Sequence, residues 1–176
     1  MVTFQIMSQD QVNRLLDIDR SEYIDIIYEI RNGEMIAIPS EHECPTWTEE
    51  MMEGLQKRFE FEIANGGFAV GAFDENKLIG FGVLAYKFRG RDLNQLQVDL
   101  MYVTRNYRRQ GIGTRIFNQL SEEAKRRGAK YLYISSTETR SAVSFYQSNG
   151  SYLATEIDEE LYNLEPKDIH LIIELE

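Results

Sequence analysis

The segment between Gln95 and Arg127 constrains the fold of this 176-residue chain more than any other part of it. Residues 95–103 are typical of a strand. A helix over 111–127 is predicted by an apolar stripe at helical spacing, which consists of Ile112, Ile116, Leu120 and Ala124. A strand that leads into an amphipathic helix buries that stripe against a sheet, so the segment predicts a mixed α+β architecture.

The turn between this strand and this helix carries the residues expected to bind an anion. The first N–H groups of a helix have no intrahelical partners and attract negative charge. Gly111 and Gly113 remove Cβ atoms that would keep a phosphate away from that backbone. Arg108 and Arg109 add positive charge, and Thr114 can donate a hydroxyl. The turn therefore predicts a pyrophosphate cradle, and a helix start with solvated arginines is the simpler alternative.

Two familiar nucleotide-binding patterns fit this turn poorly. A Walker loop needs Gly-Lys followed by Ser or Thr, and the sequence contains no such tripeptide. A dinucleotide fingerprint needs a third glycine where Ile116 stands, and it needs a tight turn directly after the strand. Here a longer stretch separates Val103 from Gly111.

The remaining elements are predicted from apolar periodicity and turn residues. The expected strands are Val2–Ile6, Ile24–Ile30, Glu34–Ile38, Phe68–Phe73, Leu78–Tyr86, Lys130–Ser135, Ser151–Ile157 and Asp168–Glu174. Three further helices are expected. The first begins at Ser8 and turns Val12, Leu15 and Leu16 inward. The second runs from Thr46 or Thr48 to Ala64 and turns Met52, Leu55, Phe59 and Ile63 inward, and the third spans 139–148. Asn32-Gly33 predicts a tight hairpin turn, and Pro39 to Pro45 predicts a loop. We expect one domain over residues 1–176.

Composition and charge indicate the compartment and the partners. Cys44, the one cysteine, cannot form an internal disulfide, and no apolar run approaches the ~20 residues of a membrane span, so we expect a cytoplasmic protein without membrane contact. The run Glu-His-Glu-Cys at 41–44 has no second ligand cluster, so we expect no metal. The net charge of −10 disfavours nucleic acid. Residues 87–140 nevertheless carry a net charge of +7, between the ends 1–60 at −8 and 141–176 at −7.

Two motifs resemble those of the GNAT superfamily of acetyl-CoA-dependent N-acetyltransferases. Arg108-x-x-Gly111-x-Gly113 matches the superfamily signature of Arg or Gln, two residues, Gly, one residue, and Gly or Ala. The strand before it, Asp99–Val103, is similar to the fourth strand of that superfamily, which splays from the next strand and exposes backbone groups to pantetheine.

The second motif lies about 30 residues downstream and corresponds to Asn-x-x-Ala-x-x-Phe-Tyr-x-x-x-Gly-Phe in the superfamily. This chain contains Ala142, Phe145, Tyr146 and Gly150 at the matching positions, listed here in chain order. Two residues depart from the motif, namely Thr139 in place of Asn and Ser151 in place of the final Phe.

The resemblance covers residues 67–152 and implies a fold. That fold is a central, mostly antiparallel sheet of about seven strands with a splayed central pair and helices on both faces. The hairpin at 24–38 is an addition to the usual helix–helix connection. It could form a wall of the acceptor pocket or the edge of a homodimer, and the sequence does not choose between these.

The resemblance also implies a site with no metal. Cofactor-binding residues are implied at Met101, Tyr102, Val103, Arg108, Arg109, Gln110, Gly111, Ile112, Gly113, Thr114 and Thr139. Tyr146 would protonate or stabilise the leaving thiolate, although a Phe-Tyr pair on a helix also fills cores. Asp99 would be the base, since we expect it to share a strand face with Gln97 and Met101. Water could serve instead.

The function implied is acetyl transfer from acetyl-CoA to a primary amine of a small acceptor by direct attack. The acceptor site of the superfamily falls in the acidic ends of this chain, which favours a cationic acceptor. Two alternatives remain open: acetylation of a protein lysine or N-terminus, and an acyl-CoA-binding module without catalysis.

Overall fold

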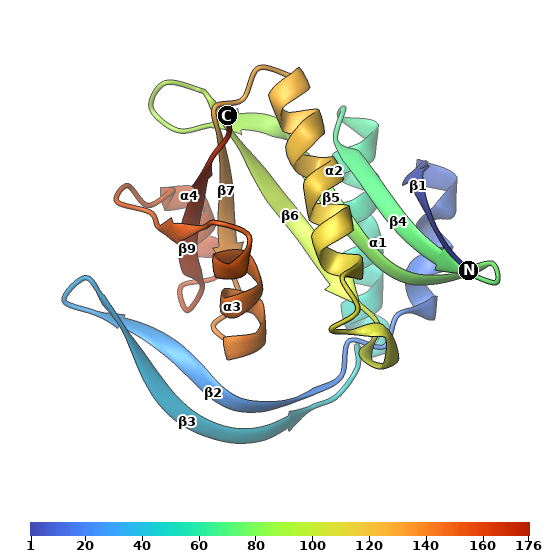
Figure 1. Ribbon diagram of the computed structural model, residues 1–176, viewed down its shortest axis with the longest axis horizontal. Coiled ribbons are helices and arrows are strands. Elements are labelled where there is room, and N and C mark those ends of the chain that lie inside the picture. Colours follow the sequence, from blue (N-terminus) through green and yellow to red (C-terminus); the bar gives the residue numbers. More distant parts are fainter.

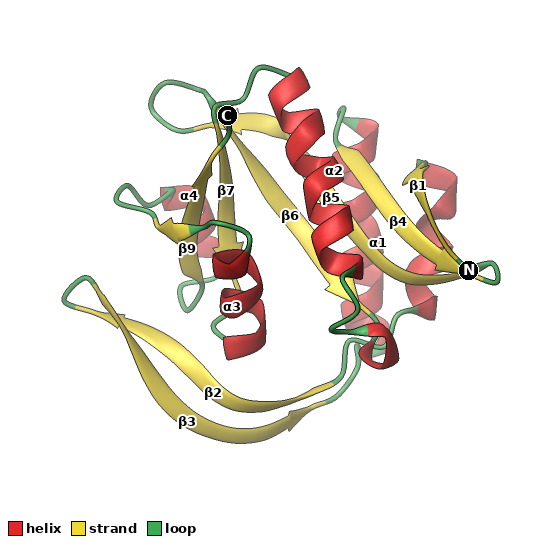
Figure 2. Ribbon diagram, in the orientation of Figure 1, coloured by secondary structure: helices red, strands yellow, loops and turns green.

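The computed structural model describes residues 1–176 as a large sheet between two layers of helices, with a separate hairpin (Figures 1 and 2). In chain order the elements are β1 (Val2–Met7), the 3-10 helix η1 (Gln9–Asp17), β2 (Glu22–Arg31), β3 (Glu34–Cys44), α1 (Glu49–Ala64), β4 (Phe68–Asp74), β5 (Lys77–Arg89), β6 (Gln95–Val103), the 3-10 turn η2 (Arg105–Tyr107), α2 (Ile112–Arg126), β7 (Tyr131–Ser136), α3 (Arg140–Ser148), β8 (Tyr152–Leu153), α4 (Glu159–Leu164) and β9 (Ile169–Glu174).

The large sheet has seven strands in the order β1-β4-β5-β6-β7-β9-β8. Every neighbouring pair is antiparallel except β6 and β7, which are parallel. These two strands pair only where Gln95–Gln97 meets Tyr131–Tyr133, and they then diverge (Figure 1). The predicted α+β class and the seven-stranded, mostly antiparallel sheet with a splayed central pair are confirmed.

Each face of the sheet carries its own apolar core. The α2 core lies under α2 and α3 and includes Ile116, Leu120, Leu132, Val143 and Leu171. The α1 core lies under η1 and α1 and includes Leu15, Leu55, Phe59, Phe81 and Leu100. All four residues of the predicted α2 stripe are buried, so this helix packs on the sheet as its periodicity predicts.

The regular alternation of β6 is interrupted at Asp99. Val98 and Leu100 pair with consecutive residues of β5, so Asp99 is the extra residue of a β-bulge. Leu100 packs in the α1 core, whereas Met101 packs against the α2 core. The Asp99 side chain reaches α1. The expectation that Asp99 shares a face with Gln97 and Met101 is therefore wrong for Met101, because a bulge shifts the two-residue period.

The predicted hairpin is present and is longer than expected. Asn32 and Gly33 have φ angles of 53° and 79°, which a tight hairpin turn requires. The loop predicted from Pro39 to Pro45 is wrong, because β3 continues to Cys44. Pro39 lies beside a register shift of the hairpin, and such irregular positions tolerate proline in a strand.

Two N-terminal helices differ in detail from the prediction. η1 buries Leu15 completely, but Leu16 is 64% exposed, because a 3-10 helix turns its side chains faster than the assumed α-helix. α1 begins after Thr48, whose Oγ1 accepts the Met51 N–H at 3.2 Å. Glu62 of α1 is also buried, at 7% exposed, although the predicted apolar stripe of this helix does not include it.

The C-terminal region contains a helix that the sequence did not indicate. The strand predicted over 151–157 is reduced to Tyr152–Leu153, and α4 follows it. Asp158 caps α4, since its Oδ1 accepts the Leu161 N–H at 3.0 Å. None of the helices is both long enough and apolar enough to cross a membrane.

The adjacent pair Leu15 and Leu16 tests this packing. Leu15→Ala should lower the free energy of unfolding by about 2–5 kcal/mol, because it opens a cavity in the α1 core. Leu16→Ala is the matched control and should change it by less than ~0.5 kcal/mol. Urea unfolding monitored by circular dichroism measures both, and equal losses would contradict the assigned burial.

Candidate functional site

The turn before α2 presents a row of unpaired backbone donors. The N–H groups of residues 109–114 donate to no protein acceptor, and the first bond of this helix start runs from Arg115 N–H to Gly111 O at 3.1 Å. Arg109 and Gly111 have φ angles of 62° and 81°, so the chain folds around a concave surface of N–H groups. Such a surface binds anions, and the helix dipole adds to its positive potential.

The two arginines of the turn have different roles. The Arg108 guanidinium donates through Nε to the Val103 carbonyl at 2.9 Å and through a terminal nitrogen to the Ser21 carbonyl at 2.9 Å. It therefore fastens the segment before β2 to the end of β6. We predicted that Arg108 adds free positive charge at the turn, but these bonds hold its guanidinium elsewhere. Arg109 is exposed and forms no ion pair, so it supplies the free positive charge beside the unpaired amides.

The two glycines are required for different physical reasons. Gly111 caps α2 in the left-handed region, and a Cβ there would meet no atom within 4 Å. A Cβ on Gly113 would lie 3.0 Å from the Phe145 ring, so this glycine lets α2 and α3 approach each other. Ile112 is buried and anchors the helix start, whereas the side chains of Gln110 and Thr114 are exposed.

The splay of β6 from β7 leaves backbone groups of β6 unpaired. Thr104 donates its N–H to the Ile79 carbonyl of β5 at 2.8 Å. Because strand residues alternate, Tyr102 also directs its backbone to β5, whereas Met101 and Val103 direct theirs into the gap. Of the three residues predicted to contact pantetheine, Met101 and Val103 turn their backbone groups to the gap. Tyr102 does not, and its ring packs against the α1 core.

Tyr146 projects from α3 with its ring buried. The residue is 8% exposed, its ring packs on Phe117 and Phe145, and its hydroxyl has no hydrogen-bond partner in the protein. Burial raises the pKa of Tyr146 above its ordinary value, and Tyr102, Asp168 and Asp99 raise it further. The phenol is therefore protonated at neutral pH and can donate.

Thr139, which stands where the superfamily motif has Asn, is used within α3. Its Oγ1 accepts the Ala142 N–H at 3.3 Å and so caps the helix that carries Tyr146. The structure thus places Thr139 in a supporting position behind the site.

Asp99 is held by an arginine that the sequence did not single out. Arg58 Nε lies 2.9 Å from Asp99 Oδ2, and a terminal nitrogen of Arg58 contacts Oδ1. The Asp99 side chain is 7% exposed. Each of its oxygens therefore contacts the Arg58 guanidinium, which holds the carboxylate against α1.

Glu62 lies one turn beyond Arg58 on α1 and was also missed. Burial, assisted by the charge of Asp99, raises its pKa to about 7. Its Oε2 atom is buried without a hydrogen-bond partner. Arg58 and Glu62 are four residues apart beside the apolar stripe of α1, and this spacing was the available signal in the sequence.

The fold is that of a known class of acetyl-transferring enzymes. A sequence model of the acetyltransferase (GNAT) family matches residues 24–150, and the chain therefore belongs to this family. No match is found among curated protein sequences.

Solved structures share this fold over nearly their whole length. Nourseothricin acetyltransferase is 17% identical with a TM-score of 0.74, and 99% of each chain is covered. The PaiA N-acetyltransferase from Thermoplasma acidophilum, in complex with coenzyme A, is 17% identical with a TM-score of 0.64 and 99% of each chain covered. The ribosomal-protein-S18-alanine N-acetyltransferase from Escherichia coli is 16% identical with a TM-score of 0.63, over 99% of this chain and 94% of that chain.

Glu62→Gln should stabilise the protein at high pH only. The raised pKa means that the folded state keeps a proton that the unfolded chain loses, so the folded state is penalised as the pH rises from 4.5 to about 7. The variant lacks this penalty, and its free energy of unfolding should exceed that of the wild type by ~1–3 kcal/mol at pH 8, with little difference at pH 5. Urea unfolding at several pH values measures this.

The matched control is Glu53→Gln, at an exposed position of the same helix. It should show no such pH dependence. A Glu62→Gln effect of equal size at pH 5 and pH 8 would contradict the raised pKa.

Proposed function

We propose that this acetyltransferase transfers acetyl from acetyl-CoA to a primary amine of a small, cationic acceptor by direct attack. The observation that carries the proposal is the row of unpaired N–H groups at 109–114 beside the open gap between β6 and β7. One part of the site suits a pyrophosphate, and the adjoining part suits an extended amide-bearing arm.

The residues present fit coenzyme A on both counts. The N–H groups of the turn and the free Arg109 would hold the pyrophosphate, because they supply directed donors and a fixed charge. The backbone groups of Met101 and Val103 would pair with the pantetheine amides as a further strand would. A coenzyme A complex is known for the PaiA N-acetyltransferase, which has this fold.

The chain also supplies donors for the chemistry. The thioester carbonyl needs a hydrogen-bond donor, and backbone N–H groups of β6 in the gap meet that need. As the neutral amine nitrogen bonds to the carbonyl carbon, the carbon–sulfur bond breaks, and the sulfur takes a proton from the Tyr146 hydroxyl. The proton that leaves the nitrogen restores that hydroxyl. Tyr146 can take this role because its hydroxyl is protonated at neutral pH and has no competing partner in the protein.

The acceptor is proposed to be cationic because unpaired carboxylates adjoin the site. Glu62 and Asp168 form no ion pair, and Asp168 lies near enough to Tyr146 to raise its pKa. An incoming ammonium group is attracted to such a surface and orients its nitrogen toward the gap. Asp99, which we expected to be the base, is better suited to holding Arg58 in place.

Acetyl-CoA should raise the melting temperature of the protein, and Thr114→Glu should abolish this rise. The introduced carboxylate repels the pyrophosphate, whereas an acidic side chain in the first turn of a helix favours the helix itself. Loss of the rise is thus not a folding defect. Differential scanning fluorimetry measures both.

Asn118→Glu makes the same charge change one turn farther along α2, at an exposed position, and should retain most of the rise. If no acyl-CoA stabilises the wild type, the proposed function is wrong.

Tyr146→Phe should lower kcat by about 10²-fold with little change in the acetyl-CoA-induced rise in melting temperature. The substitution removes the hydroxyl and keeps the ring that packs on Phe117. Release of free thiol from acetyl-CoA with a panel of primary amines measures turnover. An unchanged kcat would remove Tyr146 from the role of acid. If the wild type acetylates no amine or peptide, the alternative of an acyl-CoA-binding module without catalysis is favoured.

A further inference from the structure

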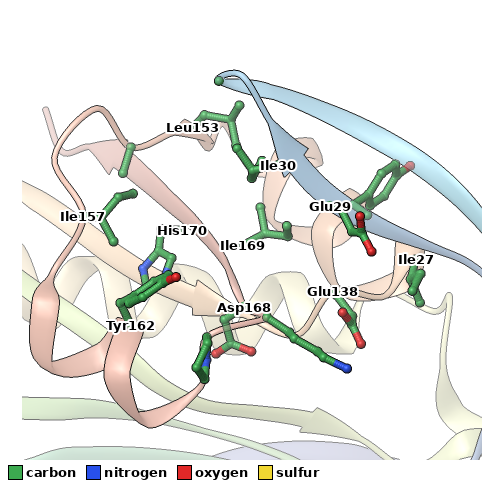
Figure 3. Close-up of a pocket in the computed structure, with 15 residues that line it drawn as sticks. Ile27, Glu29, Ile30, Glu138, Leu153, Ile157, Tyr162, Asp168, Ile169 and His170 are labelled. Atoms are coloured by element: carbon green, nitrogen blue, oxygen red, sulfur yellow. The ribbon is translucent and has the colours of Figure 1, made fainter.

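A pocket of about 590 Å³ lies between the hairpin and the C-terminal part of the chain (Figure 3). Figure 3 shows Ile27, Glu29 and Ile30 of β2 on one side and Tyr162 and His170 on the other. The hairpin is fastened to the rest of the protein at this point, since Tyr28 donates its N–H to the Glu138 carbonyl at 2.8 Å. The hairpin therefore forms one wall of the pocket.

The lining of the pocket is divided by polarity. Apolar side chains come from the hairpin and from the segment around β8 and β9, namely Ile27, Ile30, Leu153, Ile157 and Ile169. The carboxylates of the lining are Glu29, Glu138 and Asp168, and its one cation is Lys167. Glu29 is paired with Arg31 at 2.9 Å, whereas Glu138 and Asp168 form no ion pair. Such a lining suits a ligand with an apolar body and a positive end.

Asp168 connects this pocket to the site of acetyl transfer. Its Oδ2 accepts the hydroxyl of Ser135, on β7, at 2.8 Å, which leaves Oδ1 free. Burial raises the pKa of Asp168 to about 6, while the Ser135 hydrogen bond opposes the shift. Among its neighbours, Glu165 and Glu138 raise the pKa further and Arg58 lowers it. Ser135 lies beyond the point at which β7 parts from β6, so Asp168 lies at the edge of the gap between these strands, and its charge raises the pKa of the Tyr146 phenol.

His170 adds an unpartnered polar atom to the wall of this pocket. The residue is 6% exposed, and its Nδ1 lies 2.6 Å from the Tyr133 hydroxyl. That hydroxyl oxygen already accepts the Asp158 N–H at 2.9 Å, so its proton is available to Nδ1. Burial lowers the pKa of His170, which favours the neutral ring. When the Tyr133 hydroxyl donates to Nδ1, the ring hydrogen is on Nε2. Nε2 has no partner in the protein and can donate to a ligand oxygen.

We propose that this pocket is the acceptor site, that its ligand is a primary amine with an apolar body and a hydrogen-bond-accepting oxygen, and that Asp168 is a catalytic residue which binds the ammonium group. Asp168 Oδ1 first takes one proton from the ammonium group, which gives the nitrogen its lone pair. The nitrogen then bonds to the thioester carbonyl carbon as the carbon–sulfur bond breaks. The sulfur receives the Tyr146 proton, and the second proton that leaves the nitrogen restores the Tyr146 hydroxyl. The hairpin then selects the acceptor through Ile27 and Ile30. The inference rests on the proposed function and assigns its substrate class.

Asp168→Asn and Ile30→Trp test the two parts of the proposal. Asp168→Asn should lower kcat/KM by about 10²-fold for the best amine among phenethylamine, tyramine and agmatine, and should remove the fall in kcat/KM that the wild type shows below about pH 6. Ile30→Trp fills the pocket and should raise KM for that amine at least tenfold with kcat less affected. Glu174→Gln, at an exposed position of β9 outside the pocket, is the matched control and should resemble the wild type.

Isothermal titration calorimetry of the same amine into protein saturated with coenzyme A gives a readout independent of turnover. Binding should weaken at least tenfold in Asp168→Asn and Ile30→Trp, and acetyl-CoA should still raise the melting temperature of both variants. If both variants keep the kcat/KM and the amine affinity of the wild type, the pocket is not the acceptor site. If kcat/KM of Asp168→Asn still falls below about pH 6 as expected for the wild type, Asp168 is not the proton acceptor. Absence of any acetyl-CoA effect on the wild type would instead overturn the proposed function.

Discussion

The organisation of this protein depends on the end of backbone pairing between β6 and β7 after Gln97 and Tyr133. Unpaired N–H and C=O groups inside a protein are costly, so a sheet that opens at its centre must offer those groups to something else. On one side of the opening lie the unpaired amides at the start of α2, and on the other lies the pocket beneath the hairpin. An extended amide-bearing molecule and a small acceptor can therefore meet at the opening.

The ionisable groups around the proposed site are divided between the two faces of the sheet. The α2 core carries Tyr146, whose buried phenol stays protonated, while the opposite face carries the carboxylates of Glu62, Asp99 and Asp168. Arg58 occupies both oxygens of Asp99, so the charge that is left unpaired belongs to the other two. A proton donor on one face and proton acceptors on the other suit a reaction that moves a proton off nitrogen and another onto sulfur.

Much of the scaffold could be predicted because it depends on local signals. The stripe of α2, the Asn32-Gly33 turn and the β6 strand follow from side-chain period and backbone preference, which operate over a few residues. The errors arose where a distant contact decides the outcome. Pro39 continues a strand because its partner strand shifts register, and Leu16 faces solvent because η1 is a 3-10 helix.

The sequence by itself determined the family of this protein and the location of its proposed anion cradle, because glycines, arginines and an amphipathic helix at fixed spacing act through adjacent backbone. Only the tertiary structure decided how the charged residues are used. Arg108 bonds to carbonyl groups of a segment far away in the chain, and Asp99 is paired with Arg58 from another helix. Asp168 became a candidate for the same reason: burial and the approach of α4, β7 and the hairpin set its environment, and these contacts exist only after the chain has folded.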